Sequence, residues 1–336
     1  MDRNIDSDMQ AVLERMAKFN APPIETLDYW NARNNPTFKN AVEEMASQSA
    51  TTRAMNVAMP AMPEPVESIE HLLIPTRDGE VLARIYKPNT DANLPVIVYF
   101  HGGGWVIANL DVYESSCRAL CNAVEAIVVS VNYRMSPEAK FPAAINDAYD
   151  ATQWIIQNAA QIGGDPNRVA VAGESAGGNM ATVTCLQAKD QGGLMPVAQL
   201  LVYPVTDTSM SQSSYAENQD TQPLHSSMMP WFMKYYLEEN ADKNHKYLAP
   251  LQADDLSGLP PAIVITAEFD PLRDEGEQYA QKLADAGVSV KFKRYDGVVH
   301  EFFGLAGAVA KAADAVKFAA EGLKEVFDIK EKSQTN

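Results

Sequence analysis

Short apolar runs recur along the chain and predict buried strands. From Val66 onward, segments such as PVIVYF at 95–100 are continuously apolar, which is typical of a strand covered on both faces of a sheet. Further segments of this kind lie at 127–131, 169–172, 199–203, 262–266 and 288–293. An earlier pair, 70–75 and 81–87, flanks the turn at 77–79 and predicts a hairpin.

Helical patterns separate these strands and indicate the fold class. In one of them Ile145, Ala148 and Ile156 fall on a single face, and in another Ala181 and Cys185 do so. Strands that alternate with helices form a mostly parallel sheet covered on both sides. The sequence therefore predicts an α/β protein with a mostly parallel central sheet flanked by helices.

Two segments depart from this alternation. Near the N-terminus Met9, Val12 and Met16 recur at helical spacing, and three prolines within 59–65 indicate a boundary. Between 205 and 247 no strand is predicted, and a polar stretch leads into MMPWFMKYYL, which is rich in methionine and aromatic residues. A long insertion of this composition after a core strand predicts a helical lid.

Charge and composition argue against several classes of binding partner. The formal net charge of −17 argues against a nucleic-acid partner and against stable association with an anionic membrane. The N-terminal MDRNIDSDMQ lacks the basic and then apolar order of a secretory signal, so a cytoplasmic location is expected. The three cysteines, among them Cys117 and Cys121, are expected to be reduced packing residues, and no metal site is predicted.

The first candidate for chemistry lies where a strand runs into a helix. The strand at 169–172 is followed by GESAGG at 173–178, which matches the G-x-S-x-G nucleophile elbow. This turn must expose the Ser175 hydroxyl above the sheet, and Gly173 and Gly177 allow the backbone to approach closely. We expect Ser175 to be a nucleophile. A structural glycine turn with an incidental serine is the alternative that this motif alone leaves open.

A second glycine cluster follows an earlier strand, in the sequence HGGGW at 101–105. Three successive glycines cost conformational entropy and add nothing to a core, so they indicate that backbone amides approach a ligand oxygen. In hydrolases with the elbow, one oxyanion donor is the amide after the nucleophile, here Ala176, and another comes from such a loop. A flexible glycine loop is the alternative, but the two motifs together favour an oxyanion hole.

A serine nucleophile needs a general base, and the five histidines allow a choice by elimination. His71 falls on the early hairpin, His101 in the glycine loop, and His225 and His245 in the insertion. His300 remains. It follows the last predicted strand through a segment expected to be a loop, and it satisfies the chain order of serine, acid and histidine.

The acid that would orient His300 is expected at the end of a strand. The segment AIVITA leads to Asp270, which stands just before a proline that stiffens the turn. Its carboxylate would hold the imidazole tautomer and stabilise the imidazolium. Glu268 is the nearest rival, and we prefer Asp270. Asp274 and Glu275 are expected to be first-turn residues of the next helix, where the helix dipole favours acids.

With these residues in place, the chain resembles the hormone-sensitive-lipase-like esterases, the bacterial family IV of the α/β-hydrolase superfamily. The motifs that carry the resemblance are HGGGW (101–105), NYRMSPEAKFPAA (132–144), DPNRVAVAGESAGGN (165–179), DPLRDEG (270–276) and HEFF (300–303). The resemblance implies an α/β-hydrolase catalytic domain of residues 61–204 and 248–336. It also implies a helical cap built from residues 1–60 and from the insertion at 205–247.

The resemblance also implies roles in the glycine loop. The backbone amides implied as oxyanion donors are those of Gly103, Gly104 and Ala176. His101 and Gly102 would shape the loop, and the segment 132–134 would brace it. Glu174 departs from the family, much of which carries aspartate at this position, and we expect it to tune the surroundings of the elbow without changing the reaction.

Together these residues predict a cofactor-free serine carboxylesterase that acts on small-molecule esters with short- or medium-chain acyl groups. Ser175 would attack the ester carbonyl while His300 takes its proton, and water would later cleave the acyl-enzyme. The side chains expected to line the substrate pocket, each with a place in the core as the alternative, are Trp105, Met228, Met229, Trp231, Phe302 and Phe303.

Other activities and assemblies stay open at this point. An amidase or peptidase would use the same triad, and a receptor with this fold would bind a small ligand without turnover. Such a receptor is expected to lack a triad member, and none is missing here. Haloalkane dehalogenases place aspartate at the elbow, so Ser175 argues against their chemistry. The sequence also leaves a homodimer open.

Overall fold

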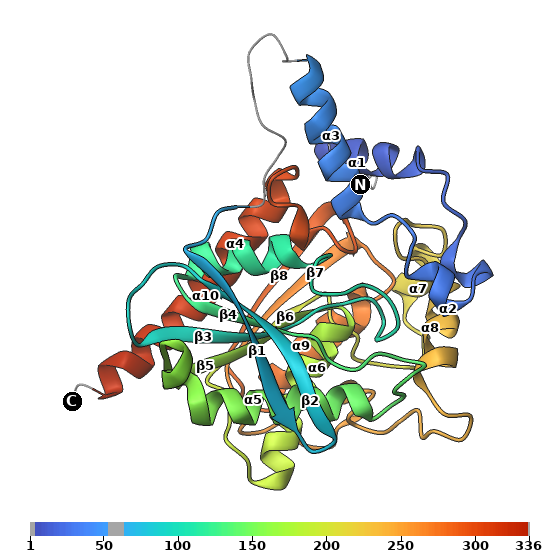
Figure 1. Ribbon diagram of the computed structural model, residues 1–336. Helices are drawn as coiled ribbons and strands as arrows, with labels where there is room; N and C mark the ends of the chain where they lie inside the picture. Colours follow the sequence, from blue (N-terminus) through green and yellow to red (C-terminus); the bar gives the residue numbers. More distant parts are fainter. Residues whose placement is uncertain (1–3, 53–63, 335–336) are drawn as a thin grey trace.

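The computed structural model describes residues 4–52 and 64–334, and a mostly parallel sheet of eight strands lies at its centre (Figure 1). The strands are β1 (Ser68–Thr76), β2 (Gly79–Lys87), β3 (Leu94–Phe100), β4 (Ile127–Val131), β5 (Gly164–Glu174), β6 (Gln199–Val202), β7 (Ala262–Phe269) and β8 (Val290–Val299). Their order across the sheet is β1-β2-β4-β3-β5-β6-β7-β8. The hairpin β1–β2 pairs antiparallel, as does β2 with β4, and all other neighbours are parallel.

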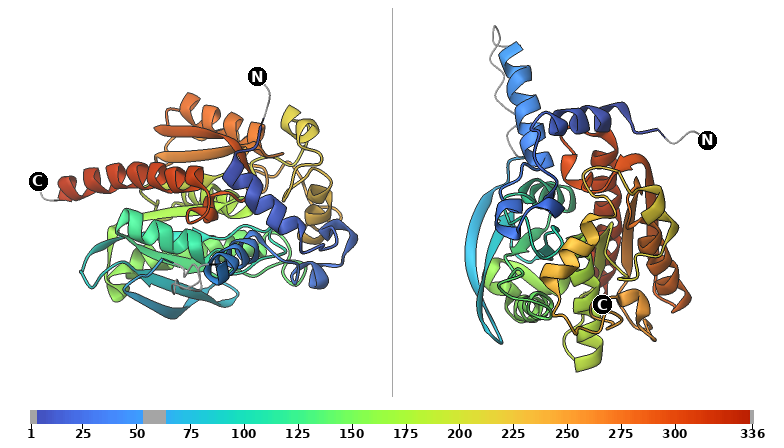
Figure 2. Two further views of the ribbon diagram at one scale, coloured as in Figure 1. Left: turned by 90° about the horizontal axis from the view of Figure 1, so that it is seen from above. Right: turned by 90° about the vertical axis from the view of Figure 1, so that its right-hand side faces the viewer.

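Helices cover both faces of the sheet (Figures 1 and 2). The helices packed on the sheet are α4 (Glu114–Val124), α5 (Ala143–Asn158), α6 (Ala176–Gln191), α9 (Arg273–Asp285) and α10 (Ala310–Gln334). Short 3₁₀ turns lie at η2 (Ala159–Ile162), η3 (Pro250–Gln252) and η4 (Phe303–Leu305). Helices α4 and α10 contribute to one apolar core, and α5, α6 and α9 contribute to the core on the opposite face.

The continuous apolar runs of the sequence follow from this double coverage. In β3, Val96, Val98 and Phe100 pack into the core beneath α5 and α6, whereas Ile97 and Tyr99 pack into the core beneath α4 and α10. All five side chains are fully buried. Because successive side chains of a strand point to opposite faces, both sets must be apolar. The predicted α/β class with a parallel central sheet is confirmed.

Two further segments lie together at one side of the sheet (Figures 1 and 2). The N-terminal segment carries α1 (Ser7–Ala17), η1 (Ile24–Thr26), α2 (Tyr29–Ala32) and α3 (Phe38–Thr52), and the insertion at 205–247 carries α7 (Ser213–Glu217) and α8 (Met228–Tyr236). The indole Nε1 of Trp231 in α8 donates a 2.9 Å hydrogen bond to the carbonyl oxygen of Leu27. The boundary predicted from the prolines at 59–65 falls largely on residues outside the described ranges, as do residues 1–3 and 53–60 of the predicted N-terminal part of the cap.

The last strand is longer than the sequence analysis predicts. The segment 295–299 was expected to be a loop, but β8 continues through it to Val299, which pairs with Phe269 of β7. The register of the two strands shifts between Ala267 and Phe269, and Gly297 accommodates the irregularity with a φ of 76°. The Asp-Gly pair that resembles a turn signal therefore lies within a strand.

The cysteines, membrane-spanning helices and metal sites considered from the sequence can be examined in the described residues. The thiols of Cys117, Cys121 and Cys185 are buried and unpaired in disulfides. No helix within residues 4–52 and 64–334 has the length and apolarity needed to cross a membrane. Across those same two ranges, no three His, Cys, Asp or Glu side chains are grouped so that they would hold a metal ion.

Candidate active site

The turn between β5 and α6 holds Ser175 in a sharply bent conformation, with φ 57° and ψ −118°. A Cβ atom on Gly173 would overlap the carbonyl oxygen of Gly177, and one on Gly177 would overlap the carbonyl oxygen of Phe100. Only glycine fits at either position. The two glycines of the elbow motif are therefore required by close backbone packing, which presses the turn against the end of β3.

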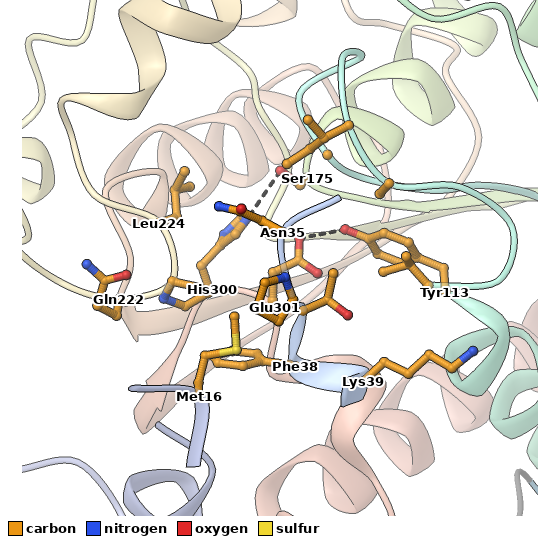
Figure 3. A pocket seen from close by; sticks show the side chains of 18 of the residues that line it. Met16, Asn35, Phe38, Lys39, Tyr113, Ser175, Gln222, Leu224, His300 and Glu301 are labelled. Carbon is orange, nitrogen blue, oxygen red and sulfur yellow. Dashed lines mark hydrogen bonds and ion pairs between the residues drawn. The ribbon is translucent and has the colours of Figure 1, made fainter. Parts of the chain in front are cut away.

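The carboxyl ends of three parallel strands bring together the three residues selected from the sequence. Ser175 follows β5, Asp270 follows β7, and His300 follows β8. The Nε2 atom of His300 lies 3.0 Å from the Oγ atom of Ser175 (Figure 3). The Nδ1 atom of His300 lies 2.6 Å from Oδ2 of Asp270. Asp270 is fully buried, and its Oδ1 atom accepts a 2.8 Å hydrogen bond from the Leu272 amide. The arrangement can therefore pass a proton from the hydroxyl to the imidazole.

The surroundings of His300 favour its protonated form. Burial lowers the pKa of the imidazole, but the charge and hydrogen bond of Asp270 raise it, and the nearby carboxylates of Glu301 and Glu174 add to that effect. The net result is a pKa above the ordinary value. A raised pKa suits a base that must hold a proton while negative charge develops on a substrate oxygen.

The rival acid Glu268 serves another purpose. Its Oε2 atom accepts a 2.8 Å hydrogen bond from the amide of Gly297, within the irregular part of β8. Glu268 thereby supports the strand that delivers His300, whereas Asp270 contacts the imidazole itself.

The glycine loop after β3 faces the same cavity as Ser175. Gly103 and Gly104 line that cavity and adopt φ values of 93° and 57°, in the region that favours glycine. No backbone carbonyl of the described residues accepts a hydrogen bond from either amide. Ala176 begins α6, where the first amides of a helix have no partner within the helix. These three amides are thus available for a ligand oxygen.

Large side chains press on the glycine loop. A Cβ atom on Gly102 would overlap the Tyr113 hydroxyl, and one on Gly104 would overlap the ring of Phe232 from α8. The side chain of Trp105 is fully buried and stacks on Tyr236, with ring centroids 4.1 Å apart. The run of glycines is needed because α4 and the insertion both approach the loop closely.

The segment 132–134 braces the start of this loop through Tyr133. Its ring stacks on His101 with centroids 4.3 Å apart, and its hydroxyl donates a 3.0 Å hydrogen bond to the carbonyl oxygen of His101. Burial lowers the pKa of His101 to about 4, so its ring stays neutral near pH 7. Arg134 acts elsewhere, in ion pairs with Asp147 and Asp78.

Two carboxylates lie beside Ser175 and His300, those of the buried Glu174 and the partly exposed Glu301. Glu174 accepts hydrogen bonds from the hydroxyls of Tyr99 and Tyr203, and burial together with the charge of Glu301 raises its pKa. Glu301 accepts a 2.6 Å hydrogen bond from the Tyr113 hydroxyl. Glu301 is the second residue of the HEFF motif, and no pattern in the sequence marks it as part of the site.

A cavity of about 800 Å³ opens over these residues. Ser175, His300 and the glycine loop form its floor, and the N-terminal segment and the insertion form its walls. Of the aromatic and methionine side chains expected there, Trp105, Met228 and Met229 line the cavity. Lining residues that the sequence analysis did not select include Met16, Phe38, Val205, Leu224 and Phe232.

Trp231, Phe302 and Phe303 do not line the cavity, so their assignment to the pocket was wrong. The Trp231 ring packs against Phe232 and Tyr235 while its Nε1 atom bonds to the N-terminal segment. Phe302 and Phe303 are fully buried in the core beneath α4 and α10. Each of the three is close in sequence to a residue that lines the cavity, but the local backbone direction points its side chain away from the cavity.

A family model described as the alpha/beta hydrolase fold matches residues 97–304. This range includes Ser175, Asp270, His300 and the glycine loop, but not the N-terminal segment that forms part of the cavity wall. The chain belongs to the α/β-hydrolase family. Carboxylesterase NlhH of Mycobacterium tuberculosis is 43% identical over 274 residues, covering 78% of this chain and 86% of the relative. The predicted membership of the hormone-sensitive-lipase-like branch is confirmed by this similarity.

Solved esterase structures share the same architecture over almost the whole chain. An esterase of Pyrobaculum calidifontis is 36% identical, with a TM-score of 0.81, and the match covers 96% of this chain and 98% of that one. A thermostable esterase of Pseudomonas putida is 37% identical, with a TM-score of 0.85 and the same coverage. This α/β-hydrolase chain is therefore similar to these esterases beyond the region of the family model, including its N-terminal segment.

Proposed function

We propose that this α/β-hydrolase is a serine carboxylesterase, with Ser175 as nucleophile, His300 as general base and acid, and Asp270 as the orienting acid. The observation that carries the proposal is the hydrogen-bonded series Ser175–His300–Asp270 on the floor of a cavity. Relatives with the same fold include a carboxylesterase, an arylesterase of Saccharolobus solfataricus and an ethyl acetate hydrolase of Pseudomonas putida.

The proposed reaction proceeds through an acyl-enzyme. The Ser175 oxygen attacks the ester carbonyl carbon, and its proton passes to Nε2 of His300. The amides of Gly103, Gly104 and Ala176 donate to the resulting oxyanion. The tetrahedral intermediate collapses, and His300 returns the proton to the departing alcohol oxygen. A water molecule then attacks the acyl-enzyme by the same route, releasing the acid and restoring Ser175. No cofactor takes part in these steps.

The proposed substrates are small esters with short- or medium-chain acyl groups. A cavity of about 800 Å³ lies within the range of small-molecule sites and would enclose an ester of this size. Its walls include the apolar side chains of Met228, Met229 and Phe232, which favour an apolar acyl chain. Residues 4–52 and 205–247 are proposed to act together as the cap that closes over this substrate, because Trp231 joins them. The homodimer and the cytoplasmic location stay predictions of the sequence.

The decisive test is Ser175→Ala beside the wild-type protein on p-nitrophenyl esters of graded chain length. We expect kcat to fall by about 10³-fold or more, with a preference in the wild type for acyl chains of roughly two to eight carbons. Ser257→Ala, at an exposed position away from the cavity, serves as the matched control. Substantial activity in Ser175→Ala would contradict the mechanism. Comparison with anilides of the same acids separates an esterase from an amidase, and binding without turnover would indicate a receptor.

A further inference from the structure

Glu301 occupies an unusual position beside the proposed general base. Its Oε1 atom lies 3.7 Å from Nε2 of His300, which is the nitrogen that faces Ser175. The Tyr113 hydroxyl donates a 2.6 Å hydrogen bond to the same Oε1 atom, and Figure 3 shows Glu301 between His300 and Tyr113. The Oε2 atom has no hydrogen-bond partner among residues 4–52 and 64–334. The side chain lines the cavity and is 27% exposed.

The backbone at Glu301 supports a role for this carboxylate. Its φ of 68° lies in the left-handed region, where side chains other than glycine are disfavoured. Strained residues of this kind cluster at ligand sites, because the surrounding structure holds them for a purpose other than stability. Here the conformation directs the side chain away from the core that receives Phe302 and into the cavity. Tyr113, only 4% exposed, then fixes one carboxylate oxygen.

No arginine or lysine among the described residues that line the cavity pairs with Glu301. Arg33 and Lys39 line the cavity, but Arg33 pairs with Glu138 and the Lys39 ammonium donates to the carbonyl oxygen of Asp111. The groups that face Glu301 are His300, Tyr113 and the carboxylates of Glu174 and Asp270. Burial, together with the charge of Asp270, raises the pKa of Glu301 above its ordinary value, although His300 and Tyr113 act to lower it. A cationic ligand at Oε2 would stabilise the ionised carboxylate of Glu301, and the carboxylate would in turn stabilise the bound cation.

The proposed mechanism determines which half of an ester meets this carboxylate, so the inference rests on the proposed function. His300 protonates the departing alcohol oxygen through Nε2, which brings that oxygen within hydrogen-bond distance of the nitrogen. Oε1 of Glu301 lies 3.7 Å from the same nitrogen, so it flanks the alcohol half of the substrate. We propose that Glu301 is a specificity-determining residue that selects esters of amino alcohols, whose positive charge lies a few bonds beyond the ester oxygen.

The test compares two esters of the same shape that differ in charge, butyrylcholine and 3,3-dimethylbutyl butyrate. In the wild type we expect a higher kcat/KM for the charged ester. In Glu301→Gln the ratio of the two kcat/KM values should fall about tenfold, since one attractive charge is lost at close range. Asp220→Asn is the matched control, because Asp220 is an exposed carboxylate at the cavity wall with no contact to His300. Its ratio should change by less than about twofold.

Each outcome decides the proposal. A ratio of kcat/KM values that is unchanged in Glu301→Gln would overturn the proposal. An equal fall of the ratio in Asp220→Asn would also overturn it, because the overall negative charge of the cavity would then explain the preference for the charged ester. Glu301→Gly provides a second variant that suits the left-handed backbone and also removes the charge, so its ratio should fall likewise.

Failure of the proposed function would be seen separately, as p-nitrophenyl butyrate hydrolysis that survives in Ser175→Ala. Calorimetric binding of choline to the wild type and to Glu301→Gln decides the inference even without turnover. We expect its Kd to rise about tenfold in the variant, and equal Kd values would reject the role of Glu301.

Discussion

The Nε atom of Arg33 donates a 2.8 Å hydrogen bond to the carbonyl oxygen of Val106, one residue beyond the glycine loop. A second guanidinium nitrogen donates to the carbonyl oxygen of Ser136 at 2.8 Å, and the group also pairs with Glu138. A residue near the start of the chain thereby ties two segments that surround the proposed oxyanion hole. The N-terminal segment is thus a structural support of the site as well as a wall of the cavity.

Replacement of Arg33 by Gln is expected to weaken both stability and activity. Loss of the guanidinium leaves two carbonyl oxygens without their donor, so the free energy of unfolding should fall by about 1–3 kcal/mol. Loosening of the loop should lower kcat by about tenfold. Urea denaturation and p-nitrophenyl ester assays measure the two effects. Arg294→Gln removes a more exposed arginine that pairs only on the surface, and it should alter neither quantity appreciably.

Replacement of Asp270 by Asn should lower kcat by about 10³- to 10⁴-fold, because the amide no longer holds the imidazole tautomer or stabilises the imidazolium. Asp270 raises the pKa of His300, so the acidic limb of the pH–rate profile should move to lower pH in the variant. The control is Glu268→Gln, which tests the rival acid and should retain kcat within about tenfold. A larger loss in Glu268→Gln than in Asp270→Asn would reverse the assignment.

The elbow should tolerate no side chain at its second glycine. In Gly177→Ala the added Cβ would overlap the carbonyl oxygen of Phe100, so β3 and α6 would have to separate. We expect a destabilisation of about 3 kcal/mol or more, measured by urea or thermal unfolding. Gly307→Ala is the matched control, since no atom lies within 4 Å of its added Cβ. Equal stability of the two variants would contradict the close packing described here.

Apolar patterning predicted the sheet well because β3 to β7 are buried on both faces, and the motifs identified Ser175 because only glycine fits beside it. Parallel strands end at one edge of a sheet, so residues that follow β5, β7 and β8 must meet there. The order of strands across the sheet is decided by packing between distant segments and could not be inferred. For the same reason the extension of β8 was missed.

The wrong assignment of Trp231, Phe302 and Phe303 to the pocket shows a second limit of prediction from sequence. An aromatic side chain next to a site residue is equally suited to a core and to a cavity wall, and the two differ only in the local backbone direction. Phe302 follows Glu301 by one position, yet Phe302 is fully buried in the core whereas Glu301 lines the cavity. The left-handed turn at Glu301 separates them, and nothing in the sequence of a non-glycine residue signals such a turn.

The burial of a charged residue is equally hard to predict from sequence, as Glu275 shows. Its position in the first turn of α9 was predicted, but its full burial was not. One carboxylate oxygen accepts a 2.7 Å hydrogen bond from the Thr206 amide, and the other accepts a 2.8 Å bond from the Tyr215 hydroxyl. Glu275 therefore joins α9 to the start of the insertion. Burial raises its pKa to about 8, against the lowering effect of these hydrogen bonds.

This raised pKa makes the stability of the protein depend on pH. The unfolded chain loses the Glu275 proton near pH 4.3, whereas the folded protein keeps it until about pH 8. The stabilisation is therefore fully present below about pH 4 and is lost progressively as the pH rises to 8, by up to about 5 kcal/mol. Glu275→Gln cannot ionise, so its free energy of unfolding should fall less than that of the wild type between pH 5 and 8. Urea denaturation across this range measures the difference, with Glu321→Gln on the exposed face of α10 as control. Parallel curves for the wild type and Glu275→Gln would show that the buried carboxyl ionises as readily in the folded protein as in the unfolded chain.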